Sequence, residues 1–205
     1  MRFKKFITED AAMAAATTKL QESLHCVAYA IRQMKKKDIV VDDLFDPDLF
    51  GQAYTKFCNV DSPEGELFTF VGNEKWVDPI IESANAAKKS GYLKKNNYEF
   101  HRGSAFMNSI YQQAQILMKN DGIKMGNDKW NPSDIWATTI KAVPKFDNLI
   151  QYNDWIREQL EKGTLVGISL KQVKGKAKVV LSSPGEKHEP LGYGSISKQR
   201  DYLPI

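Results

Sequence analysis

The sequence is poor in residues that build metal clusters and covalent cross-links. Its 205 residues include only two cysteines, Cys26 and Cys58, and three histidines. The cysteines fit no metal-binding spacing such as C-x-x-C, and two thiols in a chain of this length exclude a disulfide framework. We expect both thiols to be buried as small hydrophobic side chains in a reducing compartment.

Long apolar runs are also absent. No stretch approaches eighteen consecutive apolar residues, and the first residues lack the apolar core and small-residue cleavage site of a secretory signal. We therefore expect no membrane contact and a location in an aqueous, cytosolic space. With 42% hydrophobic and 26% charged residues, the chain can bury one sizeable core or two small ones.

The sequence motifs of the common enzyme classes are missing as well. There is no G-x-S-x-G, no glycine-rich phosphate loop ending in Lys-Ser/Thr and no H-E-x-x-H. His25 is next to an apolar helix face, which favours a buried structural role, whereas a surface role is expected for His101. The tryptophans near the predicted strands are expected to pack in the core: Trp130, Trp136 and Trp155.

Positive charge is concentrated at the C-terminal end. Residues 1–163 hold 22 Lys+Arg and 22 Asp+Glu, whereas residues 164–205 hold 7 and 3. The densest group is Lys171, Lys174, Lys176 and Lys178, with no acid between them. The last three could follow a nucleic-acid backbone, and a solvated β-hairpin with exposed lysines explains them equally well.

Apolar periodicity and turn signals predict an α/β (α+β) fold: a small mixed sheet flanked by helices behind a helical N-terminal region. Helices are expected at about 18–36, 47–57, 79–89, 104–120 and 148–161. Strands are expected at 67–71, 135–140, 165–170 and 179–181, with a tight turn at 174–176. A composition shift near 98–103 divides the chain into 11–100 and 101–182, between a short segment 1–10 and an irregular tail 183–205. Whether the two parts share one core stays open.

Two of these strands carry polar groups that could perform chemistry together. Asp134 precedes the strand that starts at Ile135, and Ser169 and Lys171 are two residues apart on the next strand, so they share a face. If the strands are neighbours, Asp134 meets this pair. A carboxylate can hold a divalent cation, and a lysine can orient water and offset phosphate charge. A turn acid and an exposed strand lysine are the plain alternative.

The surrounding residues resemble the PD-(D/E)xK nuclease-like superfamily. The resemblance rests on Lys129-Trp130-Asn131-Pro132-Ser133-Asp134-Ile135-Trp136 and on Leu165-Val166-Gly167-Ile168-Ser169-Leu170-Lys171, and it covers roughly 103–181. It implies a restriction-endonuclease-like core in which Asp134 binds Mg²⁺ or Mn²⁺, Lys171 is the catalytic lysine and the Leu170 carbonyl is a metal ligand. Ser169 stands where the family usually has an acid, and would contact phosphate or a metal-bound water.

The resemblance also implies a second acid on the preceding helix, which here has none. Glu82, Glu99 and Asp128 are the candidates to supply it, and Glu99 is nearest to the start of that helix. A missing carboxylate would weaken Mg²⁺ binding, so an inactive member of the superfamily is the serious alternative.

The first nine residues carry a second resemblance. Met1-Arg2-Phe3-Lys4-Lys5-Phe6-Ile7-Thr8-Glu9 is similar to the head-targeting leaders of internal proteins in large tailed bacteriophages, which are cleaved after an Ile/Leu-x-Glu signal. The resemblance implies a cut after Glu9 and a location in the host cytoplasm or the virion head. An ordinary amphipathic helical turn explains the same residues.

Together these features predict a phage-encoded, divalent-metal-dependent nuclease that hydrolyses phosphodiester bonds, with DNA favoured over RNA as the partner. The alternative is a catalytically inactive virion or host-interaction protein that binds DNA or protein. A structural head component with no nucleic-acid role is a third hypothesis. Symmetric dimerisation leaves no mark in the sequence and stays open.

Overall fold

The computed structural model describes residues 2–173 and 176–182, and side chains for 13–73 and 75–170. The helices are α1 (Arg2–Lys35), α2 (Val41–Phe45), α3 (Pro47–Phe57), α4 (Glu64–Phe70), α5 (Glu74–Lys89), α6 (Ala105–Asn120), α7 (Asn127–Trp130) and α8 (Leu149–Lys162). The strands are β1 (Cys58–Val60), β2 (Glu99–Arg102), β3 (Ile135–Thr138), β4 (Leu165–Val173) and β5 (Lys176–Ser182). Among the helices in the described residues, none is long and apolar enough to cross a lipid bilayer.

The described strands form one mixed sheet in the order β1-β2-β3-β4-β5. β1 pairs with β2 in parallel, and every other neighbouring pair is antiparallel. The predicted mixed α/β architecture is therefore confirmed. The register sets Glu99 opposite Thr138 and Ile135 opposite Ile168, which decides the acids that can lie near Asp134.

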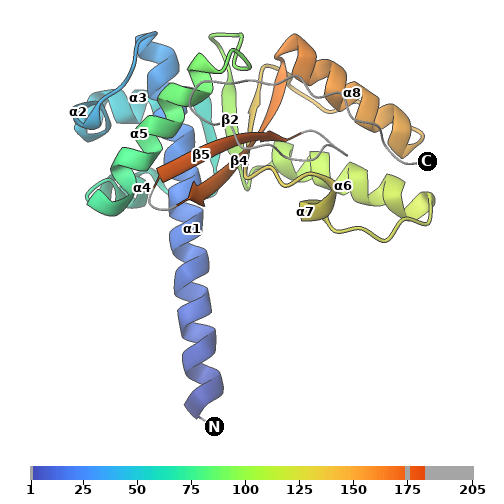
Figure 1. Ribbon diagram of the computed structural model, residues 1–205, viewed down its shortest axis with the longest axis horizontal. Helices are drawn as coiled ribbons and strands as arrows, with labels where there is room; N and C mark the ends of the chain where they lie inside the picture. The colour runs from blue at the N-terminus through green and yellow to red at the C-terminus, as the bar shows by residue number, and fades with distance from the viewer. Residues whose placement is uncertain (1, 174–175, 183–205) are drawn as a thin grey trace.

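Helices cover both faces of the sheet. Figure 1 shows α1 to α5 on one side and α6, α7 and α8 on the other. Along β3, Ile135 and Ala137 pack into the hydrophobic cluster beneath α1, whereas Trp136 packs into the cluster beneath α6 and α8. This alternation is the two-residue periodicity of a strand that is buried on both faces.

The composition shift near 98–103 does not separate two cores. The larger cluster combines Leu24 and Ile80 from the N-terminal helices with Phe100, Ile135 and Ile168 from the strands. Residues before and after the shift therefore share one core.

Helix α1 is longer than the periodicity predicts. It begins at Arg2, and its N-terminal part extends away from the rest of the protein (Figure 1). Residues 2–10 are thus part of helix α1, and their role as a leader stays a prediction. The tail 183–205 and the turn residues 174–175 lie outside the described residues, although the antiparallel pairing of β4 with β5 confirms the predicted hairpin.

Two predicted elements in the N-terminal half are wrong. Residues 67–71 were expected as a strand, but Glu64–Phe70 form helix α4, with the side chain of Leu67 buried. Helix α5 begins at Glu74 and contains Pro79, so Asp78-Pro79 does not mark its start. The proline removes one main-chain donor within the helix, while the burial of Ile80 and Val77 stabilises it.

The helices around the motif strands follow their sequence signals closely. The Ser104 hydroxyl accepts a hydrogen bond from the Met107 amide at the start of α6 (3.1 Å). Asn148 caps α8 in the same way, through the Gln151 amide (3.0 Å). At the end of α8, Gly163 adopts φ +62°, a left-handed conformation that favours glycine. These caps fix the segments that lead into β3 and β4.

Candidate functional site

Asp134 lies immediately before β3 and meets β4, as the sequence predicted. Its amide donates a hydrogen bond to the Ile168 carbonyl (2.9 Å), which extends the pairing of the two strands by one residue. Its carboxylate oxygen Oδ2 accepts hydrogen bonds from the Leu170 amide (2.5 Å) and the Ser169 hydroxyl (3.2 Å). The structure therefore brings Asp134, Ser169 and Leu170 together and holds the carboxylate in one orientation.

Ser169 contacts Asp134 directly. Its side chain is fully buried, and its hydroxyl donates to Asp134. Ser169 therefore supports the carboxylate of Asp134, and its contact with phosphate or a metal-bound water stays a prediction. Leu170 is half-buried and packs against the larger hydrophobic cluster, as expected for the residue between the two polar positions.

The predicted lysines lie on the β4–β5 hairpin. Register pairs Lys171 on β4 with Lys178 on β5, and Val173 with Lys176. Lys174 lies outside the described residues, and the side chains of the other three are not described. The backbone thus places three lysines on one two-stranded ribbon, and their contacts with phosphate stay predictions.

Glu99 is not brought to Asp134. It starts β2 opposite Thr138, which is four residues further along β3 than Asp134, a separation of about 13 Å at the rise of a strand. Its carboxylate instead accepts a hydrogen bond from the Asn59 amide group (3.2 Å) and pairs with Lys141. The prediction that Glu99 supplies the second acid is therefore not supported by the geometry.

Glu22, an acid that the sequence analysis did not single out, interacts electrostatically with Asp134. Burial raises the pKa of Glu22 on α1; Arg102 opposes the rise, and the negative charges of Asp134 and Asp61 add to it. Glu22 and Asp134 are therefore close enough to interact electrostatically. Glu22 precedes Asp134 by 112 residues, so the electrostatic interaction follows from the packing of α1 against the sheet and leaves no local sequence signal.

Arg102, the last residue of β2, connects Glu22 with Asp61. Its Nε donates to Glu22 Oε2 (2.8 Å), and its Nη1 donates to Oδ1 and Oδ2 of Asp61 (2.7 Å each). Burial disfavours the charge on Arg102, but the bonds to Asp61 and Glu22 outweigh burial and raise its pKa. We call Glu22, Asp61 and Arg102 the Arg102 cluster.

The turn before Asp134 is held by Tyr111 on α6. The Tyr111 hydroxyl donates to the Ser133 carbonyl (2.8 Å) and the Asn131 carbonyl (3.3 Å), and the Asn131 side chain accepts the Ser133 amide (3.1 Å). Burial raises the pKa of Tyr111 to about 12. Tyr111 therefore stays protonated, and from the α6 side of the sheet it holds the turn that leads to Asp134.

His25 and His101 are both buried, and each lies against a different hydrogen-bond partner. His25 is buried and its Nδ1 lies 2.8 Å from the Gln21 carbonyl, as the sequence favoured. His101 is also buried, which corrects the predicted surface role; its Nδ1 lies 3.0 Å from the Ser104 hydroxyl. Burial lowers the pKa of each to about 4. Trp130 and Trp136 pack in the core as predicted.

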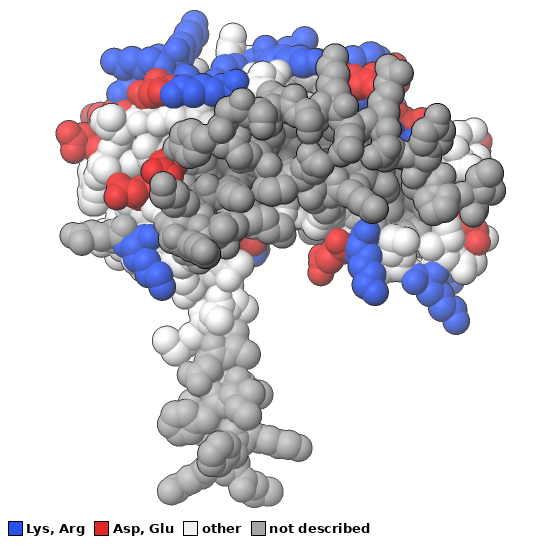
Figure 2. Space-filling view, in the orientation of Figure 1, with Lys and Arg blue, Asp and Glu red and all other residues white. Residues whose placement is uncertain are grey.

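Basic side chains gather along one edge of the molecule, as Figure 2 shows at the top of the view. The C-terminal ends of α1, α5 and α8 lie at this edge in Figure 1, and each has a basic last turn. Cations at the C-terminal end of a helix offset its negative partial charge, which is a structural explanation for them. This edge is at the Glu99 end of β2, away from Asp134.

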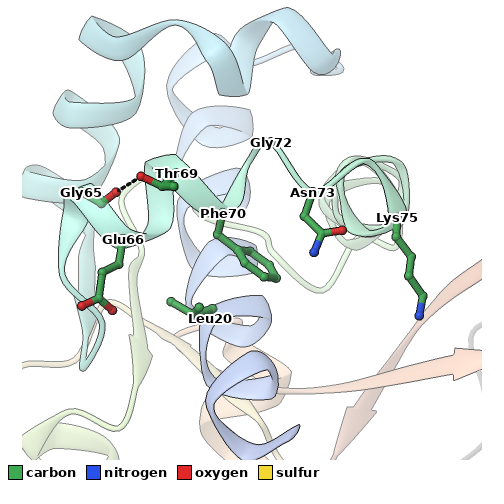
Figure 3. A pocket seen from close by; sticks show the side chains of 8 residues that line it. All are labelled: Leu20, Gly65, Glu66, Thr69, Phe70, Gly72, Asn73 and Lys75. Carbon is green, nitrogen blue, oxygen red and sulfur yellow. Dashed lines mark hydrogen bonds between the residues drawn. The ribbon is translucent and has the colours of Figure 1, made fainter. Parts of the chain in front are cut away.

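An open groove lies between α1 and α4. Figure 3 shows Leu20 and Phe70 forming its apolar part, with Glu66 on one side and Lys75 on the other. Gly65, Thr69, Gly72 and Asn73 complete the lining. The groove does not include Asp134 and offers an apolar contact surface, with no converging set of catalytic groups.

Comparisons with known proteins place no further constraint on the site. No family model, no curated protein and no solved structure matches the chain. The resemblance to PD-(D/E)xK nucleases and to phage leaders therefore stays a prediction. Within the described residues, no group of three or more His, Cys, Asp or Glu side chains is arranged to hold a metal ion.

Proposed function

We propose that the protein is a divalent-metal-dependent phosphodiesterase that acts on DNA. One observation carries the proposal: the β3–β4 pairing sets the Asp134 carboxylate against Ser169, two residues before Lys171 on the same strand. This is the juxtaposition that the sequence resemblance requires. Glu22 interacts electrostatically with Asp134, and it is the acid that we propose in place of the one that the motif lacks.

The oxygen ligands available at Asp134 are few, and they are of the kind that Mg²⁺ or Mn²⁺ binds. Mg²⁺ is usually bound through one or two carboxylates, waters and substrate phosphates. Asp134 would supply one carboxylate, and Glu22, which Arg102 contacts at 2.8 Å, would supply a second. The Leu170 carbonyl would be a third oxygen ligand. The bound metal would supply Lewis-acid polarisation of the phosphate and lower the pKa of a water.

The residues around the metal would hold the Asp134 carboxylate in place and offset the negative charge of the phosphate. The Leu170 amide and the Ser169 hydroxyl hold the Asp134 carboxylate so that it loses little freedom on binding a cation. Lys171 would orient the attacking water and offset charge on the phosphate. Lys174, Lys176 and Lys178 would contact the DNA backbone, which sets position without reading sequence.

A second function is favoured by a specific observation. Arg102 already neutralises Glu22 and Asp61, and Ser169 is fully buried, so the acids near Asp134 are partly satisfied without a metal. A nuclease-like protein that binds DNA without cutting it fits these contacts. A protein partner in a phage head or host belongs to the same alternative.

Cleavage of supercoiled plasmid and single-stranded DNA with Mg²⁺ or Mn²⁺ tests the first proposal. We expect Asp134→Asn, Glu22→Gln and Lys171→Ala each to lower the rate by roughly a hundredfold or more, as for the loss of a charge-stabilising group. Glu99→Gln is the matched control, because Glu99 is an acid of the same type at the far end of β2. Each variant must first show a native circular dichroism spectrum.

The pattern of results separates the two functions. Loss of activity in Glu22→Gln with activity retained in Glu99→Gln supports the proposed site. Folded wild-type protein that does not cut, yet binds DNA with an affinity that falls steeply as salt rises, supports the binding alternative. In that case Lys176→Ala should weaken binding to all sequences and reduce the salt slope by about one. Protein that neither cuts nor binds DNA contradicts the nuclease and the DNA-binding alternative, and leaves the protein-binding alternative.

A further inference from the structure

Positive charge is in excess where α1 and α5 end. Residues 32–38 hold four Lys+Arg and one acid, and residues 83–98 hold four lysines and no acid. The two segments lie together, because the Ile39 backbone and the Asn85 side chain exchange two hydrogen bonds (2.9 and 3.0 Å). We call residues 32–38 and 83–98 the basic edge; it is part of the edge at the top of Figure 2.

The ends of the helices explain only some of these cations. Lys36 and Lys37 follow the last residue of α1, and Lys95 lies six residues beyond the end of α5. All three side chains are exposed, and none makes a hydrogen bond or an ion pair with the described residues. Asp38, the one acid of the basic edge, already pairs with Arg32 and Lys89. The basic edge therefore presents charge that the fold itself does not neutralise.

The basic edge also contains a small cavity lined by cations. Arg32, Lys88 and Lys95 line it, and no acid is among the described residues around it. Its volume of about 10 Å³ is the space that one water-sized group needs. Arg32 is only 9% exposed, and its Nε has no hydrogen-bond partner among the described residues. A buried donor without an acceptor costs free energy, so an anion oxygen beside Arg32 would be stabilising.

Lys88 holds the chain that carries Lys95. Its Nζ donates to the carbonyls of Leu93 (2.8 Å) and Lys95 (3.0 Å) and to the side-chain oxygen of Asn96 (3.0 Å). Burial and the neighbouring charge of Arg32 lower the pKa of Lys88. The segment before β2 is thus fixed against α5, which sets Lys95 beside Arg32 before any ligand binds.

We propose that the basic edge binds the sugar–phosphate backbone of DNA, with one phosphate oxygen in the cavity beside Arg32. Lys36, Lys37 and Lys95 would neutralise neighbouring phosphates. Such contacts release counterions and position the nucleic acid without reading its sequence. The inference rests on DNA as the partner in the proposed function, but it requires neither a metal nor cleavage.

A lipid surface is the competing anionic partner, because Val40 next to the basic edge is 58% exposed. Proteins that bind a membrane surface insert apolar side chains beside their basic ones. Between residues 83 and 98, however, no large apolar side chain is exposed. This half of the basic edge is polar and charged throughout its surface, which favours a phosphate backbone in water over a bilayer.

Fluorescence anisotropy of a short labelled DNA duplex, titrated with the full chain in EDTA at several salt concentrations, tests the inference. We expect the double substitution Lys36→Ala with Lys37→Ala to weaken binding at least about tenfold and to reduce the salt slope by about two. Lys95→Ala should reduce the slope by about one. The matched control is Lys119→Ala with Lys124→Ala, which removes two exposed lysines at the end of α6 and changes the net charge equally.

Arg32→Lys tests the cavity separately from the charge. It keeps the positive charge and removes the Nε donor, so we expect several-fold weaker binding with an unchanged salt slope. Each variant must first show a native circular dichroism spectrum and melting temperature. If folded Arg32→Lys binds DNA as tightly as wild type, no phosphate oxygen occupies the cavity and that part of the inference is wrong.

The remaining outcomes separate the basic edge from the site at Asp134. Equal losses in the edge pair and the control pair would mean that only net charge matters, which overturns the inference. If the edge variants bind normally while Lys176→Ala lowers the salt slope, the hairpin contacts of the proposed function stand and the basic edge fails. Wild type that binds vesicles containing phosphatidylserine through Lys36 and Lys37, and does not bind DNA, overturns the inference in favour of a lipid surface.

Discussion

The two ends of the β2–β3 pair carry the same kinds of residues in different environments. At one end, Arg102 binds Glu22 and Asp61 where α1 covers the sheet. At the other end, Glu99 pairs with Lys141, whose side chain is 81% exposed. The ion pairs of Arg102 join three segments of the chain. The pair of Glu99 and Lys141 joins the start of β2 to the exposed segment after β3.

This difference shows that position in the register, not distance in the sequence, decides which acid belongs to a site. Glu99 is closer to Asp134 along the chain than Glu22 is, yet the strand separates Glu99 from Asp134. Glu22 interacts electrostatically with Asp134 because α1 packs against β2. We expect the two ends to differ also in how much they contribute to the free energy of unfolding.

The largest expected effect is on stability at the Arg102 end. Arg102→Met leaves Glu22 shielded without its partner, and we expect the free energy of unfolding to fall by about 3 to 4 kcal/mol. Lys141→Met breaks the exposed pair and should cost under about 1 kcal/mol. Urea unfolding at neutral pH measures both. Equal costs would mean that the two ends are energetically alike.

The next effect is a pH dependence at the Glu99 end. The pKa of His101 is lowered from 6.5 to about 4 by burial, so the unfolded chain binds more protons than the folded one between these values. Stability should therefore fall as pH is lowered from about 6.5 to about 4, by about 2 to 3 kcal/mol for this residue. Urea midpoints across this range measure the loss.

His25 provides the comparison for this prediction. Its pKa is also lowered to about 4 by burial, so it contributes a similar loss in the same window. His101→Gln should remove one part of the pH dependence and leave the part due to His25. If the pH profile of His101→Gln is identical to that of wild type, His101 is not buried in its neutral form.

Local patterns predicted much of the fold near the site. Caps and glycines located α6 and α8, and β-branched runs located β3 and β4, because these signals act within a few residues. Strands β1 and β2 were missed because they are short and gain their stability from pairing with distant segments. The segment Glu64–Phe70 was misjudged because its apolar residues fit a strand and a helix equally well.

The part of the candidate site that the sequence predicts is the part set by the pairing of β3 with β4. Asp134 and Ser169 meet because antiparallel neighbours pair residue by residue, and that needed only the guess that β3 and β4 are adjacent. Glu22, Asp61 and Arg102 come from three separate segments. Their meeting depends on tertiary packing, which no motif spacing encodes.

The smallest effect concerns the glycine that admits Asp61 to the Arg102 cluster. Gly103 and Gly122 both have positive φ, so alanine at either position incurs a backbone penalty of about 1 to 2 kcal/mol. Only Gly103 has a neighbour in the way: a Cβ there meets the Asp61 carboxylate, whereas nothing lies within 4 Å of one at Gly122. We expect Gly103→Ala to cost about 1 kcal/mol more than Gly122→Ala, because the pair between Asp61 and Arg102 weakens as well.

Paired urea titrations measure this difference in the free energy of unfolding. Repeating them in an Asp61→Asn background should remove most of the difference if the charge pair is the cause. A difference that persists in that background would assign it to steric contact alone, and the Arg102 end would then owe less of its stability to charge than its geometry indicates.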